Sequence, residues 1–424
     1  MTRPLLRADD LAELDRMLAP TDELLAARYP GDDGSRQPLH TVYVPADRYT
    51  PALPREWGEA ALDEIERQGG MASVMRELRI PDAHAGAVGA FVGRRLADEP
   101  IDDLRLDLED GYGDRGDEVE DADVRLAAER VVAAVAEGSA PRLVGVRIKG
   151  LEARTRGRGI RSLELFLTGL REAGDLPDGL ILTLPKVTTS AQVAAMAAVC
   201  GRLEERCGLA PGRLRFEVQV ETPQLVLGPD GTSPLPRAIA AAGGRLSGLH
   251  YGTYDYSASL GIAPAHQSME HPAADHAKSV MQVAAAETGV RLSDGSTNIL
   301  PVGDPESVRS AWRLSARLVR RSLERGFFQG WDLHPAQLVP RFAANGLFYR
   351  EGLAPAAARL RDWARRLDGP VRDEPATARA LAAFVARGVA CGAITAEEAT
   401  DAAGIEIATL AVLAHPQTAR RESA

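Results

Sequence analysis

The chain of 424 residues is 45% hydrophobic and 26% charged, a composition typical of a folded globular protein rather than a disordered one. Its formal net charge of -10 argues against a general binder of nucleic acid or of anionic membranes. No run of about 18 apolar residues suited to crossing a membrane occurs, so we expect a cytoplasmic protein without a membrane or nucleic-acid partner.

Residues 1–39 are expected to form an N-terminal helical segment. From His40 onward, short β-rich runs alternate with long stretches rich in Ala, Leu, Arg and Glu, which predicts parallel strands joined by helices. Six runs are clear, at 40–45, 104–110, 143–149, 179–184, 215–221 and 247–252, and two weaker ones lie at 296–301 and 329–333. Eight parallel strands close into a filled barrel, so a (β/α)8 TIM barrel is predicted over residues 40–340.

Two regions exceed what a minimal barrel needs. The segment 48–103 is longer than one crossover helix and predicts a helical insertion after the first strand. Residues 341–424 are almost wholly helical in composition and predict a C-terminal helical extension. Neither a Gly-x-Gly-x-x-Gly motif after the first strand nor a Walker phosphate loop is present, which disfavours an open nucleotide-binding sheet.

The run 215–221 alternates polar and apolar residues, so a strand would place the two kinds on opposite faces. The apolar face of a barrel strand meets the helices, which directs Glu217, Gln219 and Glu221 inward, with Glu221 nearest the C-terminal mouth. The same rule directs Arg105, Asp107 and Glu109 inward from 104–110, and Arg147 and Lys149 inward from 143–149. Deep inside the barrel, Glu217 and Arg105 are expected to neutralise one another.

A carboxylate at the mouth is costly unless it meets a cation, so Glu221 is our first metal-ligand candidate. A magnesium-type ion requires further hard oxygen ligands, and Asp255, in the small-residue loop after the sixth strand, is the natural partner. The alternative for Asp255 is a residue that caps the following helix.

Several short motifs occur in the order and at the spacing of barrel strands: Asp107-Leu108-Glu109-Asp110, Arg147, Leu184-Pro185-Lys186-Val187, Gln219-Val220-Glu221-Thr222 and the Asp255 loop. Together they resemble the HpcH/HpaI aldolase and citrate lyase β-subunit superfamily, over roughly residues 40 to 340. The resemblance implies that Glu221 and Asp255 bind Mg²⁺ or Mn²⁺. It also implies that Arg147 binds a substrate oxygen and that Gln219 contacts the bound oxo acid.

On this basis the predicted catalytic residues are Arg147, Asp110 and Glu109, and the predicted substrate-binding residues are Gln219, Asp107, Lys149 and Lys186. The aldolases carry a His where Asp110 stands, so the identity of the general base stays open. Asp110, a metal-bound water, His250, His334 and His84 are the candidates.

The resemblance implies a divalent-metal-dependent carbon-carbon lyase or aldolase, acting on a pyruvate-, oxaloacetate- or glyoxylate-like 2-oxo acid through a metal-stabilised enolate. The alternatives are an acyl-coenzyme A lyase or malate-synthase-like condensing enzyme, and a metabolite-binding subunit without catalysis. A basic stretch at 147–161 suits a phosphate or coenzyme A pocket or a solvated loop. The segment 111–123 is longer and more acidic than the short turn usual in this family, so the coenzyme A contacts that the resemblance implies there do not carry over. Barrels of this family associate, so a homo-oligomer, as a trimer or a multiple of three, is expected.

Overall fold

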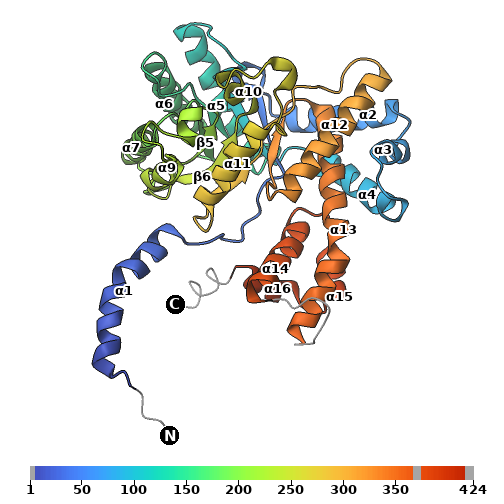
Figure 1. Cartoon of the computed structure of the whole chain (residues 1–424). Coiled ribbons are helices and arrows are strands. Elements are labelled where there is room, and N and C mark those ends of the chain that lie inside the picture. Colours follow the sequence, from blue (N-terminus) through green and yellow to red (C-terminus); the bar gives the residue numbers. More distant parts are fainter. Residues whose placement is uncertain (1–4, 366–373, 416–424) are drawn as a thin grey trace.

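Eight parallel strands form a barrel in the upper body of the molecule as drawn in Figure 1. The structure is a computed structural model that describes residues 5–365 and 374–415. The strands are β1 (His40–Pro45), β2 (Asp103–Asp107), β3 (Leu143–Arg147), β4 (Ile181–Leu184), β5 (Arg215–Val220), β6 (Leu246–Tyr251), β7 (Arg291–Ser293) and β8 (Gly330–Asp332). They pair in the order β7-β6-β5-β4-β3-β2-β1-β8, and a bridge between Ser293 and Gln329 joins the two ends. The predicted parallel barrel is confirmed.

The two faces of the strands follow the predicted alternation. Leu104 and Leu106 of β2 are buried in the main hydrophobic core, whereas Arg105 between them reaches Glu217 of β5 inside the barrel. The outer helices and 3₁₀ turns are α5 (Asp117–Glu137), α6 (Arg156–Ala173), α7 (Ser190–Cys207), α8 (Pro223–Val226), α9 (Leu235–Ala241), α10 (Thr253–Ser259), α11 (Pro272–Ala285), α12 (Pro305–Glu324), η1 (Ala46–Arg48), η2 (Pro264–His266) and η3 (Pro335–Gln337).

The seventh strand does not lie where the sequence predicted it. It spans Arg291–Ser293, and the segment 296–301 follows it as a loop with Ile299 and Leu300 exposed to solvent. A strand of three residues carries too little alternation to be recognised, which explains the error. The eighth strand, in contrast, lies within the predicted 329–333.

Three helices lie between β1 and β2: α2 (Leu53–Arg67), α3 (Met71–Glu77) and α4 (Asp82–Asp98). They share a second hydrophobic core with α12 and with α13 (Leu338–Ala364), in which Phe91, Trp312 and Phe342 are fully buried. The additional residues before β2 therefore form a helical layer against the side of the barrel.

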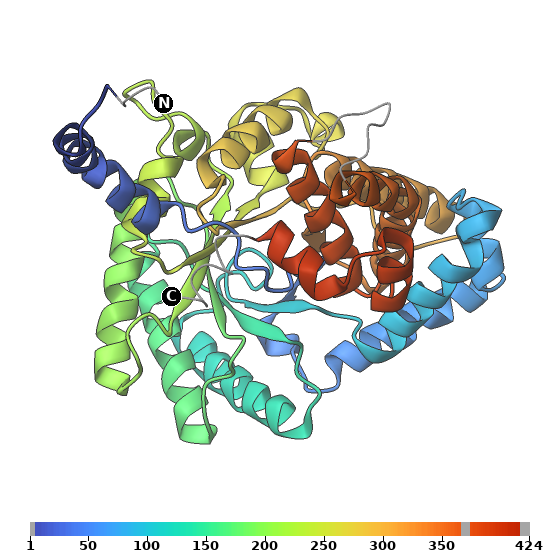
Figure 2. The ribbon, with the colours of Figure 1, turned by 90° about the horizontal axis from the view of Figure 1, so that it is seen from below.

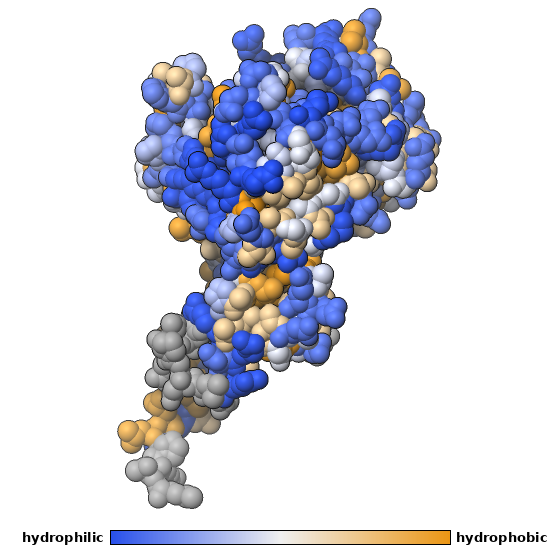
Figure 3. Space-filling model, turned by 90° about the vertical axis from the view of Figure 1, so that its right-hand side faces the viewer, coloured by the Kyte–Doolittle hydropathy of each residue, from blue (hydrophilic) through white to orange (hydrophobic). Residues whose placement is uncertain are grey.

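The C-terminal part is helical, as predicted: α14 (Pro375–Ala390), α15 (Ala396–Ala403) and α16 (Ile407–Ala414) pack with the end of α13 around Leu360, Val385 and Leu410. Figure 2 shows them as a red group beside the green and teal barrel helices. In Figure 3, hydrophobic residues are concentrated at the narrow junction between the barrel, drawn above, and the C-terminal helices, drawn below.

The helix α1 (Ala8–Arg28) extends away from the barrel and buries none of its residues (Figure 1). Residues 1–4, 366–373 and 416–424 lie outside the described part. Among the helices that are described, none combines the length and the apolar character needed to span a bilayer.

Candidate active site

A buried polar layer fills the barrel below its mouth. Arg105 binds both Asp103 and Glu217, with Nη2 2.9 Å from Oε2 of Glu217. Thr183 donates a hydrogen bond to Glu217 at 2.6 Å, and Nε2 of His250 lies 3.0 Å from the same carboxylate. Although burial acts in the opposite direction, Arg105 holds the pKa of Glu217 well below its usual value. The predicted pairing of Glu217 with Arg105 is confirmed.

Arg147 lies one layer higher, at the end of β3. Its Nε and Nη2 donate hydrogen bonds to the two carboxylate oxygens of Asp107, both at 2.7 Å. Asp107 also accepts from the backbone N–H groups of Glu109 (3.0 Å) and Gly111 (2.7 Å). Asp107 therefore orients Arg147 and closes the turn after β2 at the same time.

Two further side chains from neighbouring strands surround Arg147. The guanidinium carbon lies 4.7 Å from the centre of the Tyr43 ring, and Nη1 lies 3.4 Å from Oε1 of Gln219. The Gln219 amide in turn donates to the Tyr43 hydroxyl at 3.3 Å. Sequence reasoning did not include Tyr43 among the site residues, although the alternation of β1, with Val42 and Val44 in the core, directs it inward.

Glu221 follows β5 directly and is held from two sides. Its Oε1 accepts a hydrogen bond from the backbone N–H of Lys186 at 2.7 Å. On the other side, a Cβ placed on Gly252 would lie 2.5 Å from Cβ of Glu221 and 2.8 Å from its Oε2. A side chain at position 252 would therefore displace the carboxylate, so glycine is required for this close approach.

Asp255 lies in the first turn of α10, whose N-cap is Gly252. Its carboxylate makes no capping bond; instead Oδ2 accepts a hydrogen bond from Nζ of Lys186 at 2.6 Å. The alternative interpretation of Asp255 as a helix cap is therefore wrong, and its side chain belongs to the mouth of the barrel.

The ammonium of Lys186 brings the predicted acids together. Its Nζ lies 2.6 Å from Asp255, 2.9 Å from Asp110, 3.5 Å from Glu109 and 3.8 Å from Glu221. Lys186 has a φ of 53°, an unusual left-handed conformation for a residue with a side chain. This backbone directs its N–H to Glu221 and its side chain into the mouth.

The buried acids of this group are strongly perturbed. Burial raises the pKa of Glu221 to about 7 and that of Glu109 to about 8, against the opposing attraction of Lys186 and Arg147. The pKa of Asp110 is lowered despite partial burial, because Lys186 donates a hydrogen bond to it. The positive charge near Glu109 and Glu221 is therefore too small to offset the cost of burying their ionised forms. The more exposed Asp110 is ionised.

A divalent cation suits this donor set. Oε2 of Glu109 is buried and has no hydrogen-bond partner in the described structure, although Nη1 of Arg147 lies 3.5 Å away. Carboxylate oxygens are the ligands that Mg²⁺ and Mn²⁺ prefer. Within residues 5–365 and 374–415, no cluster of three or more His, Cys, Asp or Glu side chains is close enough together to coordinate a metal ion. The carboxylates at the mouth are instead arranged around the ammonium of Lys186. The chemistry of these carboxylates therefore fits a divalent ion.

Lys149 is directed away from this group. Its Nζ donates to the carbonyl of Leu108 at 2.7 Å and lies 2.6 Å from Glu120 of α5. In the basic stretch that follows, Arg158 and Arg161 form ion pairs with Asp121 of the same helix. The acids of the segment after β2 therefore neutralise part of the basic stretch.

The candidate histidines occupy three different environments. His250 accepts a hydrogen bond from Nε1 of Trp331 at 3.2 Å and belongs to the buried layer beneath the mouth. His334 follows β8 and caps η3, accepting from the N–H of Ala336. His84 lies in α4, outside the strand ends.

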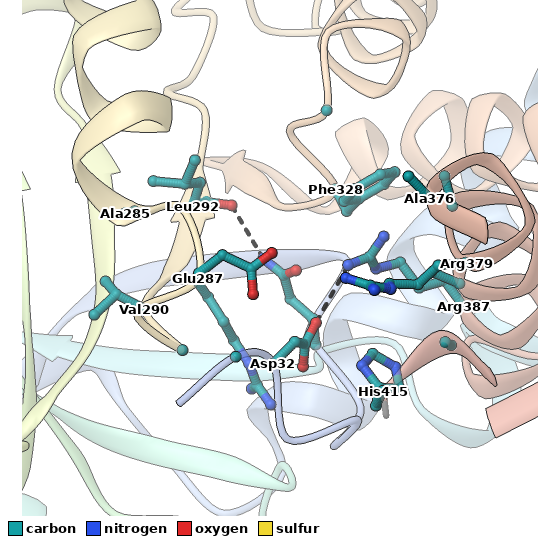
Figure 4. A pocket seen from close by; sticks show the side chains of 18 residues that line it. Asp32, Ala285, Glu287, Val290, Leu292, Phe328, Ala376, Arg379, Arg387 and His415 are labelled. Carbon is teal, nitrogen blue, oxygen red and sulfur yellow. Dashed lines mark hydrogen bonds and ion pairs between the residues drawn. The ribbon is translucent and has the colours of Figure 1, made fainter. Parts of the chain in front are cut away.

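Other cavities open at the amino ends of the strands, away from the mouth. One of about 490 Å³ lies between the segment before β1, the start of β7 and α14 (Figure 4). Arg387 of α14 crosses it to reach Asp32 at 3.3 Å and lies over the ring of Phe328. These contacts attach the C-terminal helices to the barrel, so this cavity is distinct from the candidate active site.

Comparison with known proteins identifies relatives of this barrel. Residues 18–418 match a family model described as a domain of unknown function, DUF6986. An L-malyl-CoA/β-methylmalyl-CoA lyase from Cereibacter sphaeroides is 29% identical over 282 residues, which cover 62% of this chain and 77% of that protein.

One solved structure supports the architecture. A citrate lyase from Burkholderia xenovorans superposes with a TM-score of 0.56 at 20% identity, over 86% of this chain and 96% of that one. CitE from Mycobacterium tuberculosis, solved with magnesium, acetoacetate and coenzyme A, gives a TM-score of 0.49 at 20% identity, over 85% of this chain and 99% of that one. The superfamily resemblance indicated by the motifs is confirmed, and the chain is similar to carbon-carbon lyases.

Proposed function

Since the chain belongs to the DUF6986 family and carries surplus acids at the mouth of a lyase-like barrel, we propose that it is a divalent-metal-dependent carbon-carbon lyase or aldolase for a 2-oxo acid. Residues 40–340 form the catalytic domain. One observation carries the proposal: Glu109, Asp110, Glu221 and Asp255 surround a single ammonium.

Glu221 and Asp255 hold the ion in this proposal, with Glu109 close by. A bound Mg²⁺ or Mn²⁺ supplies a Lewis acid for the oxygens of the oxo acid and for the charge that bond cleavage leaves behind. The close packing of Gly252 against Glu221 supports this role, because it holds one carboxylate in a single orientation toward the mouth.

Arg147 binds the keto oxygen on which negative charge develops. Its bidentate contact with Asp107 leaves Nη1 directed toward Gln219 and Glu109, so the guanidinium is oriented before the substrate arrives. A donor fixed in this way stabilises developing charge without reorganising. Gln219 contacts the oxo acid beside it.

Proton transfer is assigned to Glu109. In the cleavage of a hydroxylated 2-oxo acid, a base takes the hydroxyl proton, the carbon-carbon bond breaks, and its electron pair becomes an enolate that is then protonated. Oε2 of Glu109 lies 3.5 Å from Nη1 of Arg147, the group that binds the keto oxygen, and burial raises the pKa of Glu109, whereas the lowered pKa of Asp110 makes that residue a weaker base. Glu109 therefore suits the part that a His plays in the aldolases.

A coenzyme A thioester is the second candidate substrate. The likeness to a malyl-CoA lyase favours it, and Arg154 and Arg156, exposed after β3, make no ion pair in the described structure. Such guanidinium groups suit the phosphates of coenzyme A. The malate-synthase-like condensation requires the same metal pair.

The test is to supply the protein and Mg²⁺ or Mn²⁺ with pyruvate plus aldehydes, and separately with glyoxylate plus acetyl-coenzyme A or with malyl-coenzyme A. Consumption in the first mixture supports the oxo-acid aldolase, and consumption in the second supports the thioester enzyme. The variant Glu221→Gln is expected to abolish either activity. If no substrate is consumed although the protein binds metal and oxo acid, a metabolite-binding subunit replaces the proposed enzyme.

A further inference from the structure

We propose that Lys186 is an internal cation that occupies the space of the metal ion, is displaced when the ion binds, and then binds the anionic group of the substrate. This inference rests on the proposed function and adds to it a residue that controls metal loading.

The first argument is the position of the ammonium. Nζ contacts Asp255 at 2.6 Å and lies 3.8 Å from Oε1 of Glu221, the two predicted metal ligands. An ion held by both carboxylates, at about 2.1 Å from each oxygen, requires the oxygens that now face Nζ. The ammonium and the ion therefore compete for the same oxygens.

The second argument is the balance of charge around Nζ. An ammonium has three N–H donors, and the hydrogen bonds to Asp255 and Asp110 use two of them. Glu109 and Glu221, at 3.5 Å and 3.8 Å, are beyond hydrogen-bond distance. Lys186 thus stabilises the group incompletely, and a divalent ion offers more charge to the same oxygens.

The third argument is the attachment of Lys186 itself. Its backbone N–H is fixed on Glu221 at 2.7 Å in a left-handed conformation, while its side chain is a flexible stem of four carbons that carries the ammonium and is about one-fifth exposed. The ammonium can therefore leave the acids without disturbing Glu221. Once displaced it stays at the mouth, where it pairs with the carboxylate of an oxo acid.

The test measures Mn²⁺ binding by the electron paramagnetic resonance signal of the free ion, with no need for turnover. We expect Lys186→Met, which keeps the length of the stem, to bind Mn²⁺ about tenfold more tightly than the wild type. Lys186→Arg, which keeps the charge, is the matched control and is not expected to bind more tightly. In a second arm, the Mn²⁺-loaded proteins are titrated with oxalate, an anion that resembles the enolate of an oxo acid, and Lys186→Met is expected to bind it about tenfold more weakly.

Opposite changes in the two affinities support the inference, because a residue that only maintains the fold would weaken both. Circular dichroism of each variant checks folding, and Lys186→Gln provides a second neutral variant. If the wild type binds Mn²⁺, Glu221→Gln abolishes that binding and Lys186→Met leaves it equal or weaker, the role of Lys186 is overturned while the metal site stands. If neither the wild type nor Lys186→Met binds Mn²⁺, the proposed function fails together with the inference.

Discussion

Replacing Asp107 by Asn tests whether Asp107 orients Arg147 for ligand binding in addition to stabilising the barrel. Asp107 accepts two hydrogen bonds from Arg147 at 2.7 Å, and Asn keeps an acceptor for one of them but turns an amide donor toward the other. Removing one partner of a buried ion pair costs about 3–5 kcal/mol, and the retained oxygen favours the lower end, about 3 kcal/mol. Urea unfolding measures this loss.

The ligand affinity should fall as well. One hydrogen bond to a charged group contributes about 1.5–3 kcal/mol. If Arg147 loses its fixed orientation, oxalate affinity in the presence of Mn²⁺ is expected to fall about 10- to 100-fold, since each factor of ten corresponds to about 1.4 kcal/mol. Isothermal titration calorimetry measures the change.

The chain supplies a matched control outside the barrel. Glu204 of α7 holds Arg245 with both oxygens, at 2.5 Å and 2.7 Å, and accepts from the backbone N–H groups of Leu214 and Gly212. Glu204→Gln removes the same kind of contact far from the mouth, and is expected to lower stability while leaving oxalate affinity unchanged. Equal losses of oxalate affinity in the two variants would refute the positioning role of Asp107.

Three further outcomes follow from the structure. Because burial raises the folded-state pKa of Glu109 to about 8 and of Glu221 to about 7, the metal-free folded protein retains protons that the unfolded chain loses above pH 4.5. Its free energy of unfolding should therefore fall between about pH 5 and 8, as measured in urea, and a flat profile would contradict the raised values. Gly252→Ala should abolish Mn²⁺ binding with the fold retained by circular dichroism, since the new Cβ would lie 2.5 Å from Glu221; undiminished binding would show that Glu221 is not a ligand. Arg105→Met leaves Glu217 buried without its main cation and should cost about 3–5 kcal/mol of unfolding free energy, and a loss below 1 kcal/mol would argue against a structural inner layer.

The sequence predicted those site residues whose direction depends on strand geometry alone. Alternation in β5 placed Glu217 and Gln219 inside the barrel, and both are buried there. The same rule failed for Lys149, because β3 ends at Arg147 and the period of two residues does not continue beyond a strand. Lys149 instead turns to Glu120 of the neighbouring helix.

Contacts made by loops could not be predicted in this way. Lys186 lies after β4 in a left-handed conformation that no periodicity reveals, and its contacts with Asp110 and Asp255 join loops from three different strands. Asp255 was proposed from its position after the sixth strand, but that choice depended more on the family resemblance than the choice of Glu221 did. The seventh strand was misplaced because three residues are too few to show a pattern.

The two polar layers of the barrel differ in how their charges are balanced. In the lower layer, Arg105 forms ion pairs with Asp103 and Glu217, and His250 also contacts Glu217. The charges of this layer are therefore balanced without a ligand. At the mouth, two cations, Arg147 and Lys186, face five carboxylates: Asp107, Glu109, Asp110, Glu221 and Asp255. Asp107 engages Arg147 with both oxygens, so Arg147 reaches Glu109 only at 3.5 Å, and Lys186 is the ammonium shared by Glu109, Asp110, Glu221 and Asp255. A surplus of buried negative charge lowers the stability of a fold unless a cation joins it. Its location at the C-terminal ends of the strands, where barrel enzymes carry out their chemistry, is the physical reason to expect a divalent ion there.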